Sequence, residues 1–299
     1  MALARQVSER EAEGDIERIY HELRQVLRVT GVDVSLRTWA AFPRFFTAMW
    51  EALMPNIETR AFEEAADGLR DEAQEVAAGW EELGAWDAVA LGPSQRFHVK
   101  GVLELYGALQ PKVLLMVSAV RLALADEPVG LKGVPGTAER VERGVPPRMA
   151  AMEWVPDRPE DPRLRALFSE VVKTVGPPAV PGEYRALGLW PEYLEAAWSR
   201  LKPRMAEDEF TQAAESLRQS ARRQARSLPY EVALSRERVE ALGEDAAAVF
   251  RVTDALERRL PVLLLNLAQL VLDAPEVERH PFPAASRLVP DWVVAEELR

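Results

Sequence analysis

The sequence contains no cysteine. This absence excludes disulfide bonds, thiolate nucleophiles, cysteine-ligated zinc and haem attached through thioethers. Histidine is almost as scarce, and His21, His98 and His280 are scattered without any metal-ligand spacing. We therefore expect no metal and no other cofactor.

Positive charge is also in short supply. The chain has 37 Lys and Arg against 48 Asp and Glu, which gives a formal net charge of -11. Phosphate backbones are bound mainly by Lys and Arg, so nucleic acid is not an expected partner. No apolar run reaches the roughly 18 residues of a membrane span, and the first residues lack a signal-peptide core. We expect a cytoplasmic protein without a membrane partner.

Glycine, with 16 residues among 299, is sparse, and so are the signals of β-structure. The chain shows no sustained period-two alternation and no Asn-Gly or Asp-Gly hairpin turn. Residues that favour helices, namely Ala, Leu, Glu and Arg, dominate instead. The sequence therefore predicts an all-α fold. It also lacks the Gly-x-Ser-x-Gly elbow of serine hydrolases.

The most informative feature that is present is a repeat, because the first half of the chain recurs 148 residues later without a gap. Most matched positions are aromatic, aliphatic or proline. This pattern predicts two tandem homologous helical repeats that form a pseudo-dimer about a pseudo-dyad. The two sides of the single cleft between such units can diverge, which suits an asymmetric small-molecule site. Matched pairs include Phe42–Pro43 with Trp190–Pro191, Trp50 with Trp198, Pro55 with Pro203, and Phe62 with Phe210.

The repeat divides the chain into four parts. A segment rich in proline and glycine, without helical periodicity, separates the two repeats and is expected to be a long irregular linker. Several prolines near the end predict an irregular tail. The expected parts are a first helical repeat over 1–125, the linker over 126–163, a second helical repeat over 164–273 and a C-terminal tail over 274–299.

Helices within each repeat follow from apolar spacing and from proline. Pro43 and Pro191 are expected to begin equivalent helices, with Phe42 and Trp190 buried beside the pseudo-dyad. Each repeat is expected to close with a strongly apolar helix that starts after a proline. The expected helices cover 16–27 and 164–175, then about 57–80 and 206–227, and finally 113–124 after Pro111 and 262–272 after Pro261.

Three polar residues stand out in the two apolar closing segments. Asn266 and Gln269 share one face of the second segment, where buried amides must be hydrogen-bonded. They form either a helix–helix contact or a pocket wall. Lys112 follows Pro111 and is placed unfavourably against the dipole of a helix that would start there. Lys112 is either a surface residue without a specific role or the partner of an anion.

Short segments along the chain carry a family resemblance: "IERIYHELRQVLRV", "AAFP", "EEAADGLRDE", "QPKVLLMVSAV" followed by "EPVG", "EYRALGLWP" and "PFP". They resemble the group I 2-haloacid dehalogenases, which hydrolyse D- and L-2-haloalkanoic acids without a cofactor. The similarity covers about residues 15–284 in family order. The resemblance implies an all-α fold with two tandem repeats.

In that family, a carboxylate and an amide activate a water that attacks C2 directly and displaces halide with inversion. The resemblance assigns these roles to Glu183, where the family has Asp, and to Gln110, where it has Asn. Both changes keep the functional group and lengthen the arm by one methylene. Gly31 and Val34 stand where family members have pocket aromatics, so we expect a reshaped pocket. Gly182, Lys112 and Asn266 complete the expected substrate-binding set.

The repeat supports a special role for Glu183, because Ser35 occupies the equivalent position in the first unit. A carboxylate that faces a partly apolar pocket would have a raised pKa, as a general base needs. The plainer interpretation is an acidic residue at a helix N-terminus. Two functions stay open: a hydrolase acting on a small 2-halocarboxylate, or a non-catalytic homologue that binds a small ligand or a protein partner. A homodimer also stays open.

Overall fold

The computed structural model describes residues 5–131 and 138–274, and within these ranges the chain forms eleven helices and no strand. A single isolated bridge joins Thr59 and Arg140. The all-α prediction is confirmed. The helices are α1 (Asp15–Leu27), α2 (Val34–Trp39), α3 (Pro43–Ile57), α4 (Arg60–Ala78), α5 (Pro93–Ala123), α6 (Pro162–Val175), α7 (Gly182–Leu187), α8 (Pro191–Arg204), α9 (Asp208–Arg226), α10 (Arg236–Ala241) and α11 (Ala246–Asp273).

Local sequence explains where several helices begin. Pro43 and Pro191 occupy the first turns of α3 and α8, as expected, because a proline there loses no helical hydrogen bond. Asp33 caps α2 by accepting a hydrogen bond from the backbone N–H of Ser35. Thr59 caps α4 in the same way.

Helix boundaries recur at a constant spacing along the chain. Helices α2 and α7 each have six residues, and Val34 and Gly182 begin them 148 positions apart. Helices α4 and α9 each have 19 residues, and Arg60 and Asp208 begin them at the same spacing. The spacing found in the sequence is therefore also a spacing of helices.

The two closing apolar helices are longer than expected, and the prediction that they start after Pro111 and Pro261 is wrong. Both prolines lie inside continuous helices, α5 and α11, of 31 and 28 residues. A proline inside a helix removes one backbone hydrogen bond and crowds the preceding turn. Both helices are buried along most of their length, so apolar packing outweighs this local cost.

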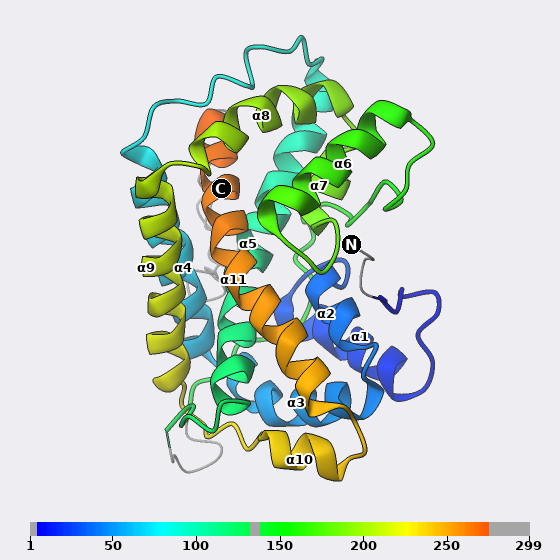
Figure 1. Ribbon diagram of the computed structural model, residues 1–299, viewed down its shortest axis with the longest axis vertical. Coiled ribbons are helices and arrows are strands. Elements are labelled where there is room, and N and C mark those ends of the chain that lie inside the picture. The colour runs from blue at the N-terminus through cyan, green and yellow to red at the C-terminus, as the bar shows by residue number, and fades with distance from the viewer. Residues whose placement is uncertain (1–4, 132–137, 275–299) are drawn as a thin grey trace, which may run out of the picture.

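Helices α5 and α11 pack against each other and cross the centre of the molecule (Figure 1). Helices α4 and α9 lie side by side along one flank and contact both central helices. The central helices also reach across the chain: α5 contacts α7, which is far later in the sequence, and α11 contacts α2. These two contacts bring residues from both halves of the chain together around the short helices α2 and α7.

Helix α5 is the one helix in the described ranges that is long and apolar enough to cross a membrane. Its most apolar window, however, is 89% buried inside the fold. This burial is what the core helix of a globular domain shows.

The prediction that Phe42 and Trp190 are buried holds only in part. Both rings pack against the core, but each is only partly buried. Trp190 stacks on the ring of His98, with the ring centroids 6.3 Å apart. Because each residue directly precedes the helix whose first turn holds the proline, its ring lies at the edge of the core.

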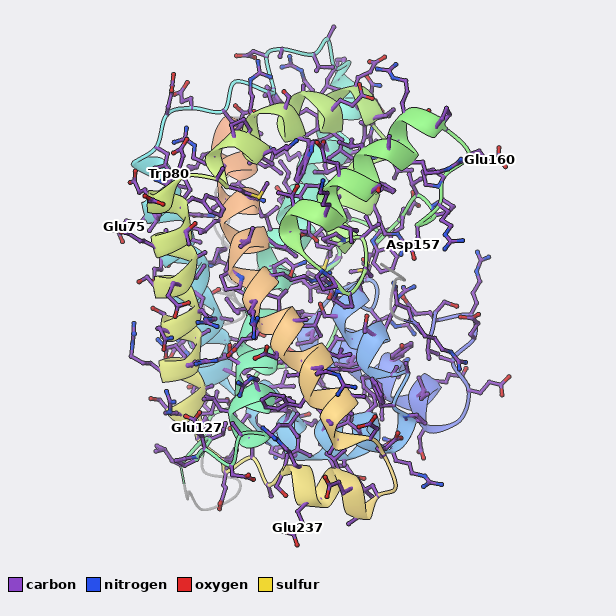
Figure 2. All side chains as sticks on the ribbon, viewed as in Figure 1. Glu75, Trp80, Glu127, Asp157, Glu160 and Glu237 are labelled. Atoms are coloured by element: carbon purple, nitrogen blue, oxygen red, sulfur yellow. The ribbon has the colours of Figure 1, made fainter. Side chains whose placement is uncertain are left out.

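The described parts of the linker, up to 131 and from 138, contain no helix before α6 and run across the first half of the chain. Thr30 donates a hydrogen bond to the carbonyl of Ala150, and the backbone N–H of Gly144 donates to Gln25. The acidic excess lies outside, as the exposed Glu75, Glu127, Glu160 and Glu237 show (Figure 2).

Candidate active site

Gln110 and Glu183 meet in the protein interior. Gln110 lies on α5 and Glu183 in the first turn of α7, two helices that pack together. The side-chain Nε2 of Gln110 donates a hydrogen bond to Oε2 of Glu183 over 3.0 Å. The two residues are only 1% and 2% exposed, respectively. The acid and the amide therefore form one buried polar pair.

The environment of Glu183 favours its protonated form. Burial, the largest cause, and the nearby charge of Asp33 raise the pKa of this carboxyl to about 8. Three interactions oppose these effects: a backbone N–H bond, the positive charge of Arg259 and the hydrogen bond from Gln110. The result is a carboxylate that accepts a proton readily near neutral pH, as a general base does.

Each side chain of the pair also carries one oxygen that forms no hydrogen bond within the described residues. Within the described residues, Oε1 of Glu183 and Oε1 of Gln110 are buried and have no hydrogen-bond partner. Buried polar atoms are nearly always bonded to protein or to water, and an unpaired one is costly. Both oxygens are therefore acceptors that are open to a further donor.

Tyr106, Gly182 and Trp154 enclose the pair. Tyr106 lies one turn before Gln110 on α5, and its hydroxyl accepts a hydrogen bond from Nε1 of Trp154 over 2.5 Å. A Cβ added to Gly182 would meet the Tyr106 hydroxyl at 2.7 Å, so only glycine allows this close packing. Burial raises the pKa of Tyr106 well above its ordinary value, and the phenol stays neutral.

Trp154, in the linker, is held by two arginines from equivalent positions of the short helices. The guanidinium of Arg37 in α2 lies 4.2 Å from the ring centroid, and that of Arg185 in α7 lies 4.5 Å away. Arg185 also pairs with Asp157, which is labelled in Figure 2, over 2.9 Å. The linker is thereby fixed over Gly182.

Arg259 and Asp33 are two charged residues at the site that sequence reasoning missed. Arg259, on α11, is 2% exposed and donates from Nη1 to the carbonyl of Ala179 over 2.8 Å. Burial lowers its pKa to about 10, while Asp33 and Glu183 act in the opposite direction. The guanidinium is therefore charged at neutral pH. Both residues are far from Glu183 in sequence. Arg259 is brought near it by the contact between α11 and the α6–α7 connection, which the sequence does not show.

Asn266 supports the neighbour of Glu183. Its Nδ2 donates to the hydroxyl of Tyr184 over 2.9 Å, and the ring of Tyr184 packs edge-on against Trp198. Burial raises the pKa of this phenol far above its ordinary value. Gln269, its expected companion, is also buried, and neither of its amide atoms has a partner in the described part of the chain.

Lys112 has partners other than the acid–amide pair. Lys112 is buried, and its Nζ donates to Glu63 over 2.7 Å and to the carbonyl of Leu27 over 3.0 Å. It follows Gln110 by two positions, so the two side chains leave α5 in different directions. Val34 is buried at the start of α2.

Gly31 lies under the linker. A Cβ at this position would meet the Cβ of Met152 at 2.8 Å, so Met152 fills the space that a side chain at Gly31 would need.

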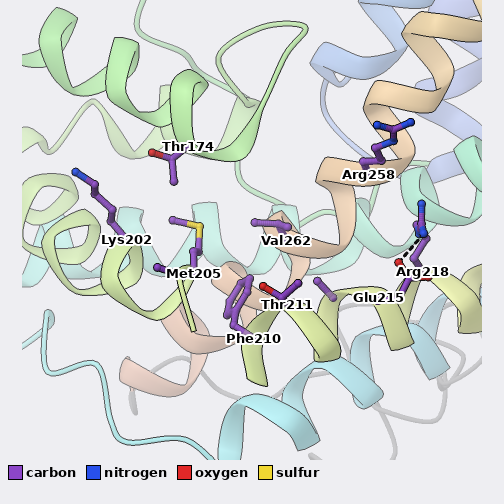
Figure 3. Close-up of a pocket in the computed structure, with 11 residues that line it drawn as sticks. Thr174, Lys202, Met205, Phe210, Thr211, Glu215, Arg218, Arg258 and Val262 are labelled. Atoms are coloured by element: carbon purple, nitrogen blue, oxygen red, sulfur yellow. Dashed lines mark ion pairs between the residues drawn. The ribbon is translucent and has the colours of Figure 1, made fainter. Parts of the chain in front are cut away.

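A cavity of about 710 Å³ opens between α6, α8, α9 and α11 (Figure 3). Neither Glu183 nor Gln110 lines it. Its wall includes Met205, whose sulfur lies 3.1 Å from Nδ2 of Asn266. Contacts therefore run from this cavity wall at Met205 through Asn266 to Tyr184, the residue next to Glu183. No group of acidic or histidine side chains in the described ranges is arranged to hold a metal ion.

The sequence matches the family model described as halocarboxylic acid dehydrogenase DehI over residues 30–176 and 178–275. A configuration-inverting 2-haloacid dehalogenase of Pseudomonas sp. (strain 113) is 28% identical over 240 residues, which cover 74% of each chain. An (R)-2-haloacid dehalogenase of Rhizobium sp. (strain NHG3) is 25% identical over 77% of this chain and 90% of the relative.

Solved structures agree with the sequence comparisons. A mutant of D-2-haloacid dehalogenase shares the fold with a TM-score of 0.83 at 22% identity, over 91% of this chain and 96% of that one. D-2-haloacid dehalogenase in complex with L-LA gives a TM-score of 0.81. The chain belongs to the DehI family of halocarboxylic acid enzymes.

Proposed function

We propose that this member of the family hydrolyses a small 2-halocarboxylate, with Glu183 as the general base and Gln110 as the residue that holds the water. The carrying observation is the buried hydrogen bond of 3.0 Å between them, which leaves one free oxygen on each side chain. The relatives named above are 2-haloacid dehalogenases, which supports this reaction class. No cofactor is required by the chemistry.

The two free oxygens suggest how the water is oriented. A water that donates one hydrogen to Oε1 of Glu183 and the other to Oε1 of Gln110 turns its lone pair away from both. In the reaction, that lone pair forms the new C–O bond at C2. The C–halogen bond breaks, and its electron pair leaves with the halide. One proton of the water passes to Glu183, which later releases it to solvent.

The raised pKa of Glu183 fits this role. A carboxyl with a pKa of about 8 is a much stronger base, once ionised, than one at its ordinary value of 4.5. The hydrogen bond from Gln110 and the charge of Arg259 stabilise the ionised form. Turnover should therefore need ionised Glu183 and increase with pH through about 8.

The site is asymmetric, although we infer that the fold is a tandem repeat. Helix boundaries at a constant spacing, and the reciprocal contacts of α5 with α7 and of α11 with α2, support two helical units related by a pseudo-dyad. Glu183 then corresponds to Ser35, so only one of the two equivalent places carries a base. Superposition of 15–123 on 162–273 tests the repeat, and unrelated helix directions would reject it.

Two differences suggest that the pocket has diverged within the family. Glu183 and Gln110 are each one methylene longer than the Asp and Asn that the family has at these positions. A shift of about 1 Å in a reacting group can cost about 100-fold in rate. Met152 from the linker also fills the space beside Gly31. We propose that these changes alter the relative rates with different 2-halocarboxylates and leave 2-chloropropionate a substrate.

A second candidate is a non-catalytic homologue of the same fold. The direct hydrogen bond between Gln110 and Glu183 favours it, because a side-chain amide already occupies one carboxylate oxygen. Such a protein would bind a small ligand and release no halide.

Halide release from each enantiomer of 2-chloropropionate distinguishes the two candidates. We expect release by the wild-type protein and none by Glu183→Gln, which removes the base and keeps the side-chain volume. The matched control is Glu192→Gln, the same change at an exposed position of α8, which should keep full activity. Absence of release with both enantiomers would support the non-catalytic homologue. Full activity in Glu183→Gln would reject the assigned base.

A further inference from the structure

Arg259 is the buried cation whose role the acid–amide pair does not explain. Its residue is 2% exposed, and Nη1 has one bond, to the carbonyl of Ala179. Its Nε is buried and has no partner within the described ranges. A guanidinium carries five N–H donors, and a buried cation is stable only when an anion and several acceptors surround it. Among the described residues, the acceptor bonded to Arg259 is the carbonyl of Ala179.

The neighbouring carboxylates are committed to other groups. Glu257, two residues earlier on α11, forms a two-pronged pair with Arg222, with distances of 2.8 and 2.6 Å. Asp33 accepts the backbone N–H that caps α2, and Glu183 accepts from Gln110. In the described part of the chain none of these three carboxylates forms an ion pair with Arg259.

Arg259 is nevertheless fixed next to the base. Ala179, whose carbonyl it holds, lies four residues before Glu183, in the connection that leads into α7. The guanidinium and the carboxylate act on each other electrostatically. The cation therefore stands beside the reacting groups without being neutralised by direct contact with either acid.

The proposed substrate brings the missing group. In a 2-halocarboxylate the carboxylate carbon is bonded directly to C2, so the anion must lie within a few ångströms of the attacked carbon. A planar guanidinium binds a carboxylate through two parallel N–H donors and fixes its orientation. One fixed end of so small a molecule determines where C2 lies relative to the water.

We infer that Arg259 binds the substrate carboxylate and thereby directs C2 towards Glu183 and Gln110. This inference rests on the proposed function for the identity of the ligand. It assigns specificity for an acid, over the corresponding amide or ester, to one side chain of α11. The plainer role, a structural tie from α11 to Ala179, would affect stability without discriminating among ligands.

The test uses equilibrium binding, so that it does not depend on turnover. Calorimetry with the full-length protein would compare 2-hydroxypropanoate, the product expected from 2-chloropropionate, with its neutral amide. We expect the wild type to prefer the acid by at least 10-fold. Arg259→Met should weaken acid binding at least 30-fold and leave amide binding within threefold. Arg259→Lys, which keeps a charge but loses the planar fork, should restore part of the preference.

Controls separate a binding role from a structural one. Arg251→Met removes an exposed arginine from the same helix and should change neither affinity by more than twofold. Circular dichroism checks the fold of each variant. If Arg259→Met does not fold, the Arg259→Lys result and the wild-type preference decide the question. Equal binding of acid and amide by the wild type, or binding of neither, would overturn the inference.

The outcome also distinguishes this inference from the proposed function. Acid binding that depends on Arg259, without halide release from either enantiomer, would keep the anion site and reject the dehalogenase. Halide release with an unchanged KM in Arg259→Met would keep the dehalogenase and reject the anion site.

Discussion

Burial of Glu183 makes a quantitative prediction about stability that is independent of catalysis. The pKa of its carboxyl is raised from 4.5 to about 8 by desolvation in the interior. Between these two values the folded protein binds a proton that the unfolded chain has released. The free energy of unfolding contributed by this group is therefore fully present below about pH 4.5 and is lost as the pH rises through 8.

The magnitude follows from the size of the shift. One pKa unit corresponds to about 1.4 kcal/mol, so the wild type should lose roughly 5 kcal/mol across this range because of Glu183 alone. The variant Glu183→Gln cannot ionise, and its amide oxygen can still accept from Gln110. Its stability relative to the wild type should therefore increase by the same roughly 5 kcal/mol between pH 4.5 and pH 8.

Urea unfolding at one-unit pH steps from 4.5 to 9 measures this difference. Glu192→Gln, an exposed site, should follow the wild type within about 0.5 kcal/mol at every pH. A gap between Glu183→Gln and the wild type that stays constant with pH would refute the reasoning, because Glu183 would then titrate normally. In the enzyme, the same ionisation should give a rate that increases about tenfold per unit below pH 8.

Three further predictions concern individual contacts. Gln110→Ala should lower kcat by about 10- to 1000-fold in the halide-release assay, because the water loses one of its two acceptors, and an unchanged kcat would exclude that role. Lys112→Met should cost about 3–5 kcal/mol in urea unfolding, because it leaves Glu63 buried and unpaired; a cost below about 1 kcal/mol would contradict the buried ion pair. Gly182→Ala should destabilise by about 1–3 kcal/mol and lower kcat, since its Cβ would meet the Tyr106 hydroxyl at 2.7 Å; wild-type thermal stability would show that this packing is loose.

The helical boundaries that depend on local rules were predictable. Pro43 and Pro191 begin helices because a proline in the first turn gives up no helical hydrogen bond. An aromatic–Pro pair occurs in both halves of the sequence. The same rule failed at Pro111 and Pro261, which lie inside α5 and α11. The cost of the lost hydrogen bond can be read from the local sequence. The apolar area that a central helix buries, which outweighs this cost, depends on the whole fold.

The family resemblance singled out Glu183 and Gln110 before the structure showed them hydrogen-bonded, and the contrast with Ser35 drew attention to Glu183. Their surroundings were not predictable from the sequence. Asp33, Glu183 and Arg259 lie on three helices or their connections, and no motif or spacing links them.

The sequence by itself determined the helical class and the 148-residue spacing of helices, because both depend on residue type and local periodicity. The acid and the amide were expected only through the family resemblance. Only the tertiary structure decided that Lys112 forms an internal ion pair with Glu63 and that buried Arg259 bonds the carbonyl of Ala179, four residues before Glu183. Both outcomes depend on which helices cross, and crossing is fixed by packing across the two halves of the chain. A charge in the sequence shows that a partner is needed, and the fold decides which partner it is.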